Sequence, residues 1–182
     1  MKKRKNIITV AIDSPAAAGA GTQAKLIAKH YNLFYLDTGK IYRYIGKLKL
    51  DKKDKFTYRL VRKKITNLKI NYLKDKSLLS NEVAISASII AKNKKIRDIV
   101  HNFQQKCAYR PPIKYKGSVL DGRDIITVQL KDAMFKFYIT ANLKVRAKRR
   151  YMELVRLNNK ISYSEVLKSI RNRDKTDKNR KY

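Results

Sequence analysis

The stretch that most constrains the fold lies near the N-terminus, where the apolar run at 7–13 leads directly into a turn of small residues at 14–22. An amphipathic run at 23–31 follows this turn. A continuous apolar run is typical of a buried strand, and apolar residues that recur every three to four positions are typical of a helix. The sequence therefore predicts a strand, a tight turn and a helix in direct succession.

The turn has the layout of a phosphate-binding P-loop but lacks some of its residues. A P-loop reads Gly, four residues, Gly, Lys, and then Ser or Thr, so that backbone N–H groups wrap the phosphates and the lysine reaches the terminal ones. Ser14 stands at the position of the first glycine, and Ala20 stands at the position of the lysine. The small residues still allow close approach of a ligand, although an ordinary strand-to-helix turn explains this stretch alone about equally well.

Size and charge limit the classes of protein to which the chain can belong. Its 182 residues fit one domain, or one core domain with a small insertion. Lys and Arg number 45 against 14 Asp and Glu, and the net charge of +31 predicts attraction to polyanions. Because the cations are scattered from end to end, we interpret them as a compositional bias and expect only non-specific contact with nucleic acid.

Cysteine content and hydropathy indicate the compartment. Cys107 is the single cysteine and cannot form an internal disulfide, while His30 and His101 are the only histidines, so no metal-ligand cluster is expected. The apolar stretch after the basic N-terminus ends at Asp13 and is too short for a signal peptide. No other stretch approaches the roughly 18 to 20 apolar residues of a membrane span. We expect a soluble, cytoplasmic protein without membrane contact.

The pattern after the first helix is that of an α/β protein. A short apolar run at 33–36 predicts a second strand, and helical spacing at 40–50 and 57–66 predicts two further helices. Strand, helix, strand, helix is the opening of a parallel sheet. The alternation of apolar and polar residues at 68–73 predicts a half-buried strand.

The second half of the chain continues this alternation. The expected elements are helices at 81–91, with Asn81 as the N-cap, and at 94–109, strands at 117–120 and 134–140, and helices begun by Asn142 and Ser162 that end near Leu157 and Lys175. Polar clusters follow three of the strands, at 13–22, 37–43 and 121–124. Because ligands bind outside the carboxyl ends of strands in open α/β sheets, these clusters predict a functional cleft rather than solvated loops.

Four segments of the chain closely resemble those of the bacterial cytidylate kinases. They read DTGKIYR at 37–43, LDGRD at 120–124, RAKRR at 146–150 and RNRDKTDKNR at 171–180, in the order and spacing of that family. The resemblance covers almost the whole chain. It implies an α/β, P-loop NTPase-like parallel sheet flanked by helices, with a kinase core at 1–50 and 93–182, a monophosphate-binding insertion at 51–92 and a helical lid at about 145–160.

The resemblance also implies a reaction in pyrimidine metabolism. A transferase of this family is expected to act as a monomer and to move the γ-phosphoryl group of ATP to CMP or dCMP, with Mg²⁺ as cofactor. Phosphoryl transfer requires two anionic substrates held in line and cations that offset their charge. Arginine suits this task because its guanidinium grips phosphate oxygens through two N–H groups.

The same resemblance assigns roles to individual residues. As catalytic residues it implies Arg123, Asp121 and the lid arginines Arg149 and Arg150, with Asp121 either capping its turn or organising the magnesium shell. For CMP it implies the phosphate clamps Arg43, Arg123 and Arg173, the phosphate contact Thr38, the cytosine contacts Asp124, Ser88 and Arg97, and the ribose contacts Asp177 and Arg180. For ATP it implies the loop residues Ser14, Pro15, Ala16, Ala17, Ala18, Gly19, Ala20, Gly21 and Thr22. No residue is assigned as a direct metal ligand.

The missing lysine is the main departure from the family. Losing such a charge typically costs a few kcal/mol of transition-state stabilisation, or roughly two to four orders of magnitude in rate. Three explanations remain open: a relative that binds nucleotide or nucleic acid without efficient turnover, another cation such as Lys40 or Lys25, or sufficiency of the lid arginines and Mg²⁺. The family also continues past the NR motif with a strand and a helix, so one sheet edge is expected to be uncovered or paired with another subunit.

Overall fold

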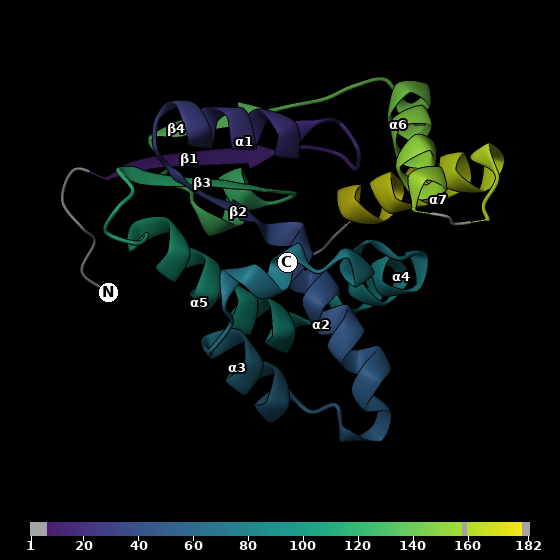
Figure 1. Cartoon of the computed structure of the whole chain (residues 1–182), viewed down its shortest axis with the longest axis horizontal. Helices are drawn as coiled ribbons and strands as arrows, with labels where there is room; N and C mark the ends of the chain where they lie inside the picture. The colour runs from purple at the N-terminus through teal and green to yellow at the C-terminus, as the bar shows by residue number, and fades with distance from the viewer. Residues whose placement is uncertain (1–6, 158–159, 180–182) are drawn as a thin grey trace.

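A parallel four-stranded sheet in the order β2-β3-β1-β4 forms the centre of the protein (Figure 1). The computed structural model describes residues 7–157 and 160–179. The strands are β1 (Ile8–Asp13), β2 (Phe34–Asp37), β3 (Gly117–Gly122) and β4 (Phe135–Tyr138). The predicted parallel α/β architecture is therefore confirmed.

The central strands are apolar on both faces because helices cover both sides of the sheet. Val10 and Ile12 of β1 pack against α1 (Ala20–His30), whereas Ala11 between them packs on the opposite face with Leu36 and Leu120. Figure 1 shows α1 on one face of the sheet and α5 (Lys94–Tyr109) on the other. This arrangement accounts for the unbroken apolar run at the N-terminus.

The edge strand β4 differs from its neighbours. It pairs only with β1 in the described sheet, and all four of its residues are exposed. Phe135 and Phe137 have 47% and 46% of their surface exposed.

None of the helices in the described parts of the chain is long and apolar enough to cross a membrane.

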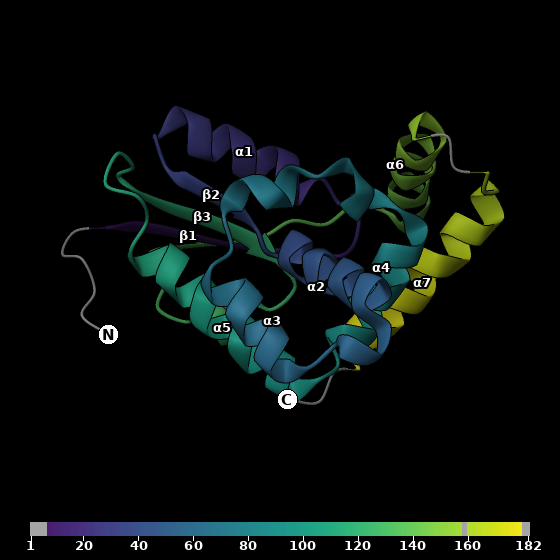
Figure 2. The same cartoon turned by 60° about the horizontal axis from the view of Figure 1, so that its bottom comes forward.

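A helical subassembly lies beside the sheet and is built on close packing of α2 (Thr38–Lys52) with α4 (Asn81–Ile90) (Figure 2). The helix α3 (Tyr58–Thr66) and the short turns η1 (Lys53–Lys55), η2 (Ile70–Lys74) and η3 (Lys76–Leu79) connect these two helices along the chain. Gly46 lies at the closest approach, where a Cβ atom would come within 2.8 Å of the backbone nitrogen of Ala87. Only a residue without a side chain fits at this contact.

Replacing Gly46 by alanine is therefore expected to destabilise the protein by about 2 to 3 kcal/mol, because the added methyl group would force α2 and α4 apart. Chemical denaturation of the two proteins measures this difference. Lys49→Ala, at an exposed position on the same helix, should change the free energy of unfolding by less than about 0.5 kcal/mol. Equal stability of Gly46→Ala and the natural protein would contradict the packing described here.

Two further helices, α6 (Leu143–Arg156) and α7 (Tyr163–Lys178), stand beyond the carboxyl ends of the strands (Figure 1). They share a small apolar cluster that includes Leu154, Val166 and Ile170. The predicted helix starts are confirmed, since Asn142 caps α6 and Ser162 forms a capping box at the start of α7.

Two details of the sequence-based prediction are wrong. Residues 68–73 form no strand, because the 3-10 turn η2 places Ile70 and Leu73 on one side, where both pack against the core. The N-cap of α4 is Ser80, whose hydroxyl accepts a hydrogen bond from the Val83 nitrogen at 3.3 Å, and Asn81 is the first helical residue. The alternating apolar pattern alone could not distinguish a strand from this 3-10 turn.

Candidate functional site

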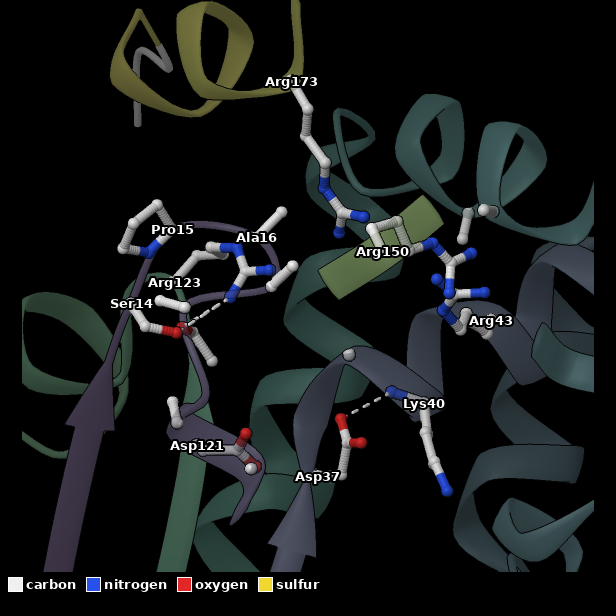
Figure 3. Close-up of a pocket in the computed structure, with 18 of the residues that line it drawn as sticks. Ser14, Pro15, Ala16, Asp37, Lys40, Arg43, Asp121, Arg123, Arg150 and Arg173 are labelled. Carbon is white, nitrogen blue, oxygen red and sulfur yellow. Dashed lines mark hydrogen bonds between the residues drawn. The ribbon is translucent and has the colours of Figure 1, made fainter. Parts of the chain in front are cut away.

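A pocket of about 400 Å³ opens at the carboxyl ends of β1, β2 and β3. Its floor is the turn that follows β1, and its walls come from the start of α2 and from one side of α4. Arginines from several elements point into it (Figure 3). All three polar clusters predicted to follow strands contribute to its lining. The volume falls in the range that encloses a small-molecule ligand.

The turn after β1 folds as a loop around the start of α1. Ala17 and Gly19 have positive φ angles of 59° and 99°, and α1 begins at Ala20. The Ser14 nitrogen donates to the Gly122 carbonyl at 3.1 Å, which ties the loop to the end of β3. The first N–H groups of a helix have no partner within the helix and can donate hydrogen bonds to a phosphate. The first turn of α1 carries no acidic residue that would repel such a group. The loop therefore suits a phosphate ligand.

Two arginines lie side by side on the far wall of the pocket. Figure 3 shows the guanidinium groups of Arg43, from α2, and Arg150, from α6, next to each other. Arg43 donates to the Leu78 carbonyl at 2.8 Å. Burial, together with the positive charge of Arg150, lowers the pKa of Arg43 to about 10. Glu153 already pairs with Arg150 at 2.8 Å, and a bound anion between the two arginines would offset more of the cost of holding them together.

A second pair of arginines faces the first across the pocket. Arg123, which follows β3, donates from Nη1 to the Gly122 carbonyl at 3.1 Å and to the Ser14 hydroxyl at 3.5 Å. Arg173 reaches down from α7 toward Arg150 (Figure 3). The Asp177 carboxylate lies between them, 3.3 Å from Nε of Arg123 and 3.9 Å from Nε of Arg173. These four arginines come from α2, the end of β3, α6 and α7, and a fifth lining arginine, Arg97, lies on α5.

Two carboxylates meet at the base of the pocket because the parallel register pairs Asp37 at the end of β2 with Asp121 near the end of β3. Asp37 caps α2 by accepting a hydrogen bond from the Lys40 nitrogen at 3.2 Å. Burial and the negative charge of Asp37 raise the pKa of Asp121 well above its ordinary value. Oδ1 of Asp121 is buried and accepts no hydrogen bond from any described residue.

These two carboxylates have the chemistry of a partial magnesium site. Mg²⁺ prefers oxygen ligands and in nucleotide enzymes is commonly held by one or two carboxylates together with substrate phosphates and water. The described residues contain no group of three His, Cys, Asp or Glu side chains that would hold a metal by themselves. The residues present therefore fit an ion that arrives with a phosphate ligand rather than one held in a protein cage.

The Asp121 carboxyl gives a prediction for stability. Because its pKa is raised in the folded protein, the folded state keeps this proton to a higher pH than the unfolded chain, and the free energy of unfolding falls as the pH rises above the ordinary aspartate range. Asp121→Asn removes this penalty. Without nucleotide or Mg²⁺, the gain in unfolding free energy from Asp121→Asn should be about 1 to 2 kcal/mol larger at pH 8 than at pH 5. An equal gain at both pH values would contradict the buried, proton-binding state of Asp121.

The wall beside α5 combines a donor and an acceptor. Arg97 forms an ion pair with Asp124, and the two side chains are 14% and 18% exposed. Ser88 of α4 lines the same part of the pocket. The carboxylate of Asp13 accepts hydrogen bonds from the nitrogens of Ile125 and Ile126 at 2.7 and 3.0 Å, at the start of the π-turn η4 (Ile125–Gln129), and so fixes the backbone just after Asp124.

The helix α6 contacts the loop after β1 directly. Arg146 is buried and donates from Nη1 to the Ala16 carbonyl at 3.2 Å, while its two terminal nitrogens bind Asp174 of α7 at 3.0 and 2.6 Å. Arg149, one turn later, donates from Nη1 to the Ala18 carbonyl at 3.0 Å. The helix α6 is therefore joined to the loop directly, and α7 is joined to it through Arg146.

Sequence comparison identifies the proteins that share this architecture. The sequence profile described as "Cytidylate kinase" matches residues 10–182. The chain belongs to the cytidylate kinase family. The cytidylate kinase of Bartonella tribocorum is 42% identical over 179 residues, which cover 94% of this chain and 79% of the relative. Cytidylate kinases of Fusobacterium nucleatum and Clostridium perfringens are 38% and 35% identical, each over 96% of this chain and 83% of the relative.

Membership in the cytidylate kinase family confirms the resemblance drawn from the four sequence segments, the P-loop NTPase-like α/β fold and the class of enzyme, a phosphotransferase. The pocket is lined by most of the residues singled out in the sequence: all nine loop residues at 14–22 together with Thr38, Arg43, Ser88, Arg97, Asp121, Arg123, Asp124, Arg150 and Arg173. Arg180 lies outside the described residues.

Three of the singled-out residues have partners that the sequence did not indicate. The Thr38 hydroxyl donates to the Asp121 carbonyl at 2.7 Å. Asp177 lies between two arginines, and Arg149 contacts the loop backbone. Sequence reasoning also assigned no role to Asp37, although it begins the DTG segment, or to Arg146, although it begins the RAKRR segment.

Proposed function

We propose that this cytidylate kinase transfers the γ-phosphoryl group of ATP to CMP or dCMP and releases ADP and CDP or dCDP. The observation that carries the proposal is the gathering of Arg43, Arg123, Arg150 and Arg173 in one pocket above a P-loop-like turn. Such an arrangement provides one phosphate site at the loop and a second one between the arginines. Two phosphate sites facing each other are what in-line phosphoryl transfer requires.

In this proposal the loop at 14–22 holds the phosphates of ATP, and Arg43, Arg123 and Arg173, with Thr38, hold the phosphate of the acceptor. Arg150 lies against Arg43 and offsets the charge that develops on the transferring group. Asp177 and Arg180 are proposed to bind the ribose. Asp177 is well placed to do so because its ion pairs with Arg123 and Arg173 hold it beside the acceptor site.

The base would be recognised by the wall at α5. Cytosine presents an amine donor beside an acceptor nitrogen and a carbonyl, so its edge needs both an acceptor and donors from the protein. The Asp124 carboxylate supplies the acceptor for the amine, while Arg97 and Ser88 supply donors. The ion pair between Arg97 and Asp124 orients both side chains before the base binds.

Mg²⁺ is proposed to enter with ATP. Asp121 and Asp37, directly or through water, and the Thr22 hydroxyl are the groups that would hold it, since all three line the pocket next to the loop. The ion would neutralise phosphate charge. The negative charge that raises the pKa of Asp121 in the free protein is the charge that favours a divalent cation there.

These roles assign three regions of the chain to separate tasks. We propose residues 1–50 and 93–182 as the kinase core, residues 51–92 as the monophosphate-binding insertion, and residues of about 145–160 as the lid that excludes water. Because one chain supplies every group of this site, we propose that the enzyme acts as a monomer. We propose that it acts in the cytoplasm, where its nucleotide substrates are available.

An ADP-coupled assay with ATP and either CMP, dCMP, UMP or AMP tests the proposal. Turnover with CMP and dCMP that exceeds turnover with UMP and AMP is the expected result. Binding of CMP without release of ADP would instead indicate a relative that holds nucleotide or nucleic acid without turnover, an alternative that no specific contact in the pocket favours.

A further inference from the structure

Asp13 is a buried carboxylate to which the proposed function gives no role. It ends β1 and has 4% of its surface exposed, and the pocket lining begins with the next residue, Ser14. Its oxygens accept from the backbone nitrogens of Ile125 at 2.7 Å and Ile126 at 3.0 Å. These bonds offset the cost of burying the charge. The side chain is therefore committed to the segment that follows Asp124, on a different strand.

Asp124 stands at the N-cap of η4, where a side-chain oxygen ordinarily accepts hydrogen bonds from the first N–H groups of its own turn. All other Asp, Asn, Ser and Thr residues at this position in the described helices and turns do so. Asp124 is the exception among them, since its side chain makes no capping hydrogen bond. The carboxylate that is proposed to read the base is thus one that does not cap its own turn.

Asp13 takes the N–H groups that Asp124 would otherwise use. The turn η4 begins at Ile125, so Ile126 supplies its second N–H group, which is one that a capping side chain ordinarily binds. Burial, and to a smaller degree the negative charge of Asp124, raises the pKa of Asp13, which agrees with two carboxylates lying close together. With these donors occupied, the Asp124 carboxylate pairs with Arg97 in the wall of the pocket.

Other contacts hold the backbone of this segment in place. The register of the sheet pairs Asp13 with Gly122, and the Ser14 nitrogen donates to the Gly122 carbonyl at 3.1 Å. Figure 3 shows Arg123 beside Ser14, whose hydroxyl lies 3.5 Å from Nη1 of the arginine. Ile125 is completely buried in the main core. Loss of the Asp13 carboxylate would therefore change what caps η4 rather than move the whole segment.

We propose that Asp13 is a positioning residue for base recognition: it binds the N–H groups at the start of η4 and so keeps the Asp124 carboxylate turned toward Arg97 and the base. The inference rests on the proposed function, in which Asp124 accepts from the amine of cytosine. Without the Asp13 carboxylate these N–H groups lose their partner, and Asp124 turns back to cap its own turn. Selectivity for cytosine then depends on a residue that does not touch the nucleotide.

The test measures kcat/KM for CMP and for UMP, each with ATP, in Asp13→Asn. Asparagine has nearly the same shape, but it keeps only one acceptor oxygen and places an amide NH₂ group against a backbone N–H group. We expect the ratio of kcat/KM for CMP to that for UMP to fall about tenfold, the weight of one hydrogen bond to a charged group. The loss should appear mainly as a higher KM for CMP, with KM for ATP unchanged.

A double variant separates positioning from general support of the fold. Because Asp13 acts through Asp124, adding Asp13→Asn to Asp124→Asn should leave the CMP-to-UMP ratio of Asp124→Asn unchanged. Asp75→Asn is the matched control. It alters an exposed carboxylate that caps η3 by accepting from the Ser77 nitrogen at 2.8 Å, and it should leave the natural ratio unchanged.

A folded Asp13→Asn protein with the natural ratio would overturn the inference, and so would a further tenfold fall in the double variant. Thermal melting shows which variants are folded. If Asp13→Asn does not fold, hydrogen exchange of the natural protein with CMP bound decides: the amides of Ile125 and Ile126 must be protected, and exchange as fast as in an open loop overturns the inference. Absence of turnover by the natural protein would overturn the proposed function as well, whereas the other outcomes bear on Asp13 alone.

Discussion

Arg123→Ala is expected to lower kcat/KM for CMP by roughly three orders of magnitude. Arg123 touches both sides of the proposed transfer path, since its Nη1 atom lies 3.5 Å from the Ser14 hydroxyl of the loop and its Nε atom lies 3.3 Å from Asp177. Removing it takes away charge at the point where the transferring group passes between donor and acceptor. Steady-state kinetics with varied CMP at saturating ATP measure the loss.

Two further variants separate geometry from charge. Arg123→Lys keeps the charge but loses the planar fork, so it should recover only part of the activity. Lys64→Ala, on the exposed face of α3, removes the same charge far from the pocket and should leave kcat/KM within about twofold. If Lys64→Ala and Arg123→Ala had equal effects, the general positive charge of the chain rather than the pocket would account for the activity.

Asp124→Asn is expected to lower the ratio of kcat/KM for CMP to that for UMP by several hundredfold, about two to three orders of magnitude. In the proposed site the carboxylate accepts a hydrogen bond from the exocyclic amine of cytosine and would repel the carbonyl that uracil presents at the same place. An asparagine amide can donate to that carbonyl. The variant should therefore lose activity with CMP and gain activity with UMP.

The selectivity ratio is the informative quantity because Asp124 also pairs with Arg97. Loss of that pair alone would weaken both substrates together and would leave the ratio unchanged. Asp51→Asn, at an exposed position in α2, serves as the charge-matched control and should not alter the ratio. An unchanged ratio in Asp124→Asn would show that this carboxylate does not read the base.

The fold was largely predictable because local patterns and the sheet agree. The apolar run of β1, the small-residue loop and α1 follow each other without interruption, and both faces of β1 are buried by helices. The helix caps Asn142 and Ser162 were readable because a side-chain oxygen that binds the first turn is a local feature. The structure of residues 68–73 could not be predicted in this way. An apolar alternation forms a strand only beside a neighbouring strand, and the described sheet has none at that place.

The sequence indicated which residues form the site but not how they are arranged in it. Residues at the ends of parallel strands gather at one edge, so Arg43, Arg123 and Asp124 could be expected there. Arg150 and Arg173 lie on α6 and α7, and only the family resemblance pointed to them. The meeting of Asp37 and Asp121 depends on the register between β2 and β3, which no local pattern encodes. Arg149 and Arg150 are neighbours in sequence, yet each residue turns an α-helix by about 100 degrees, so they face the loop and Arg43 respectively.

The most direct test of the central claim is the fate of the γ-phosphoryl group. ATP labelled at its γ-phosphorus is incubated with the protein, Mg²⁺ and CMP, and the labelled products are separated. Label in the β-phosphate of CDP, in an amount equal to the ADP released, is the result that two facing phosphate sites in one pocket predict. Label found only in inorganic phosphate, or remaining in ATP while CMP is bound, would contradict it.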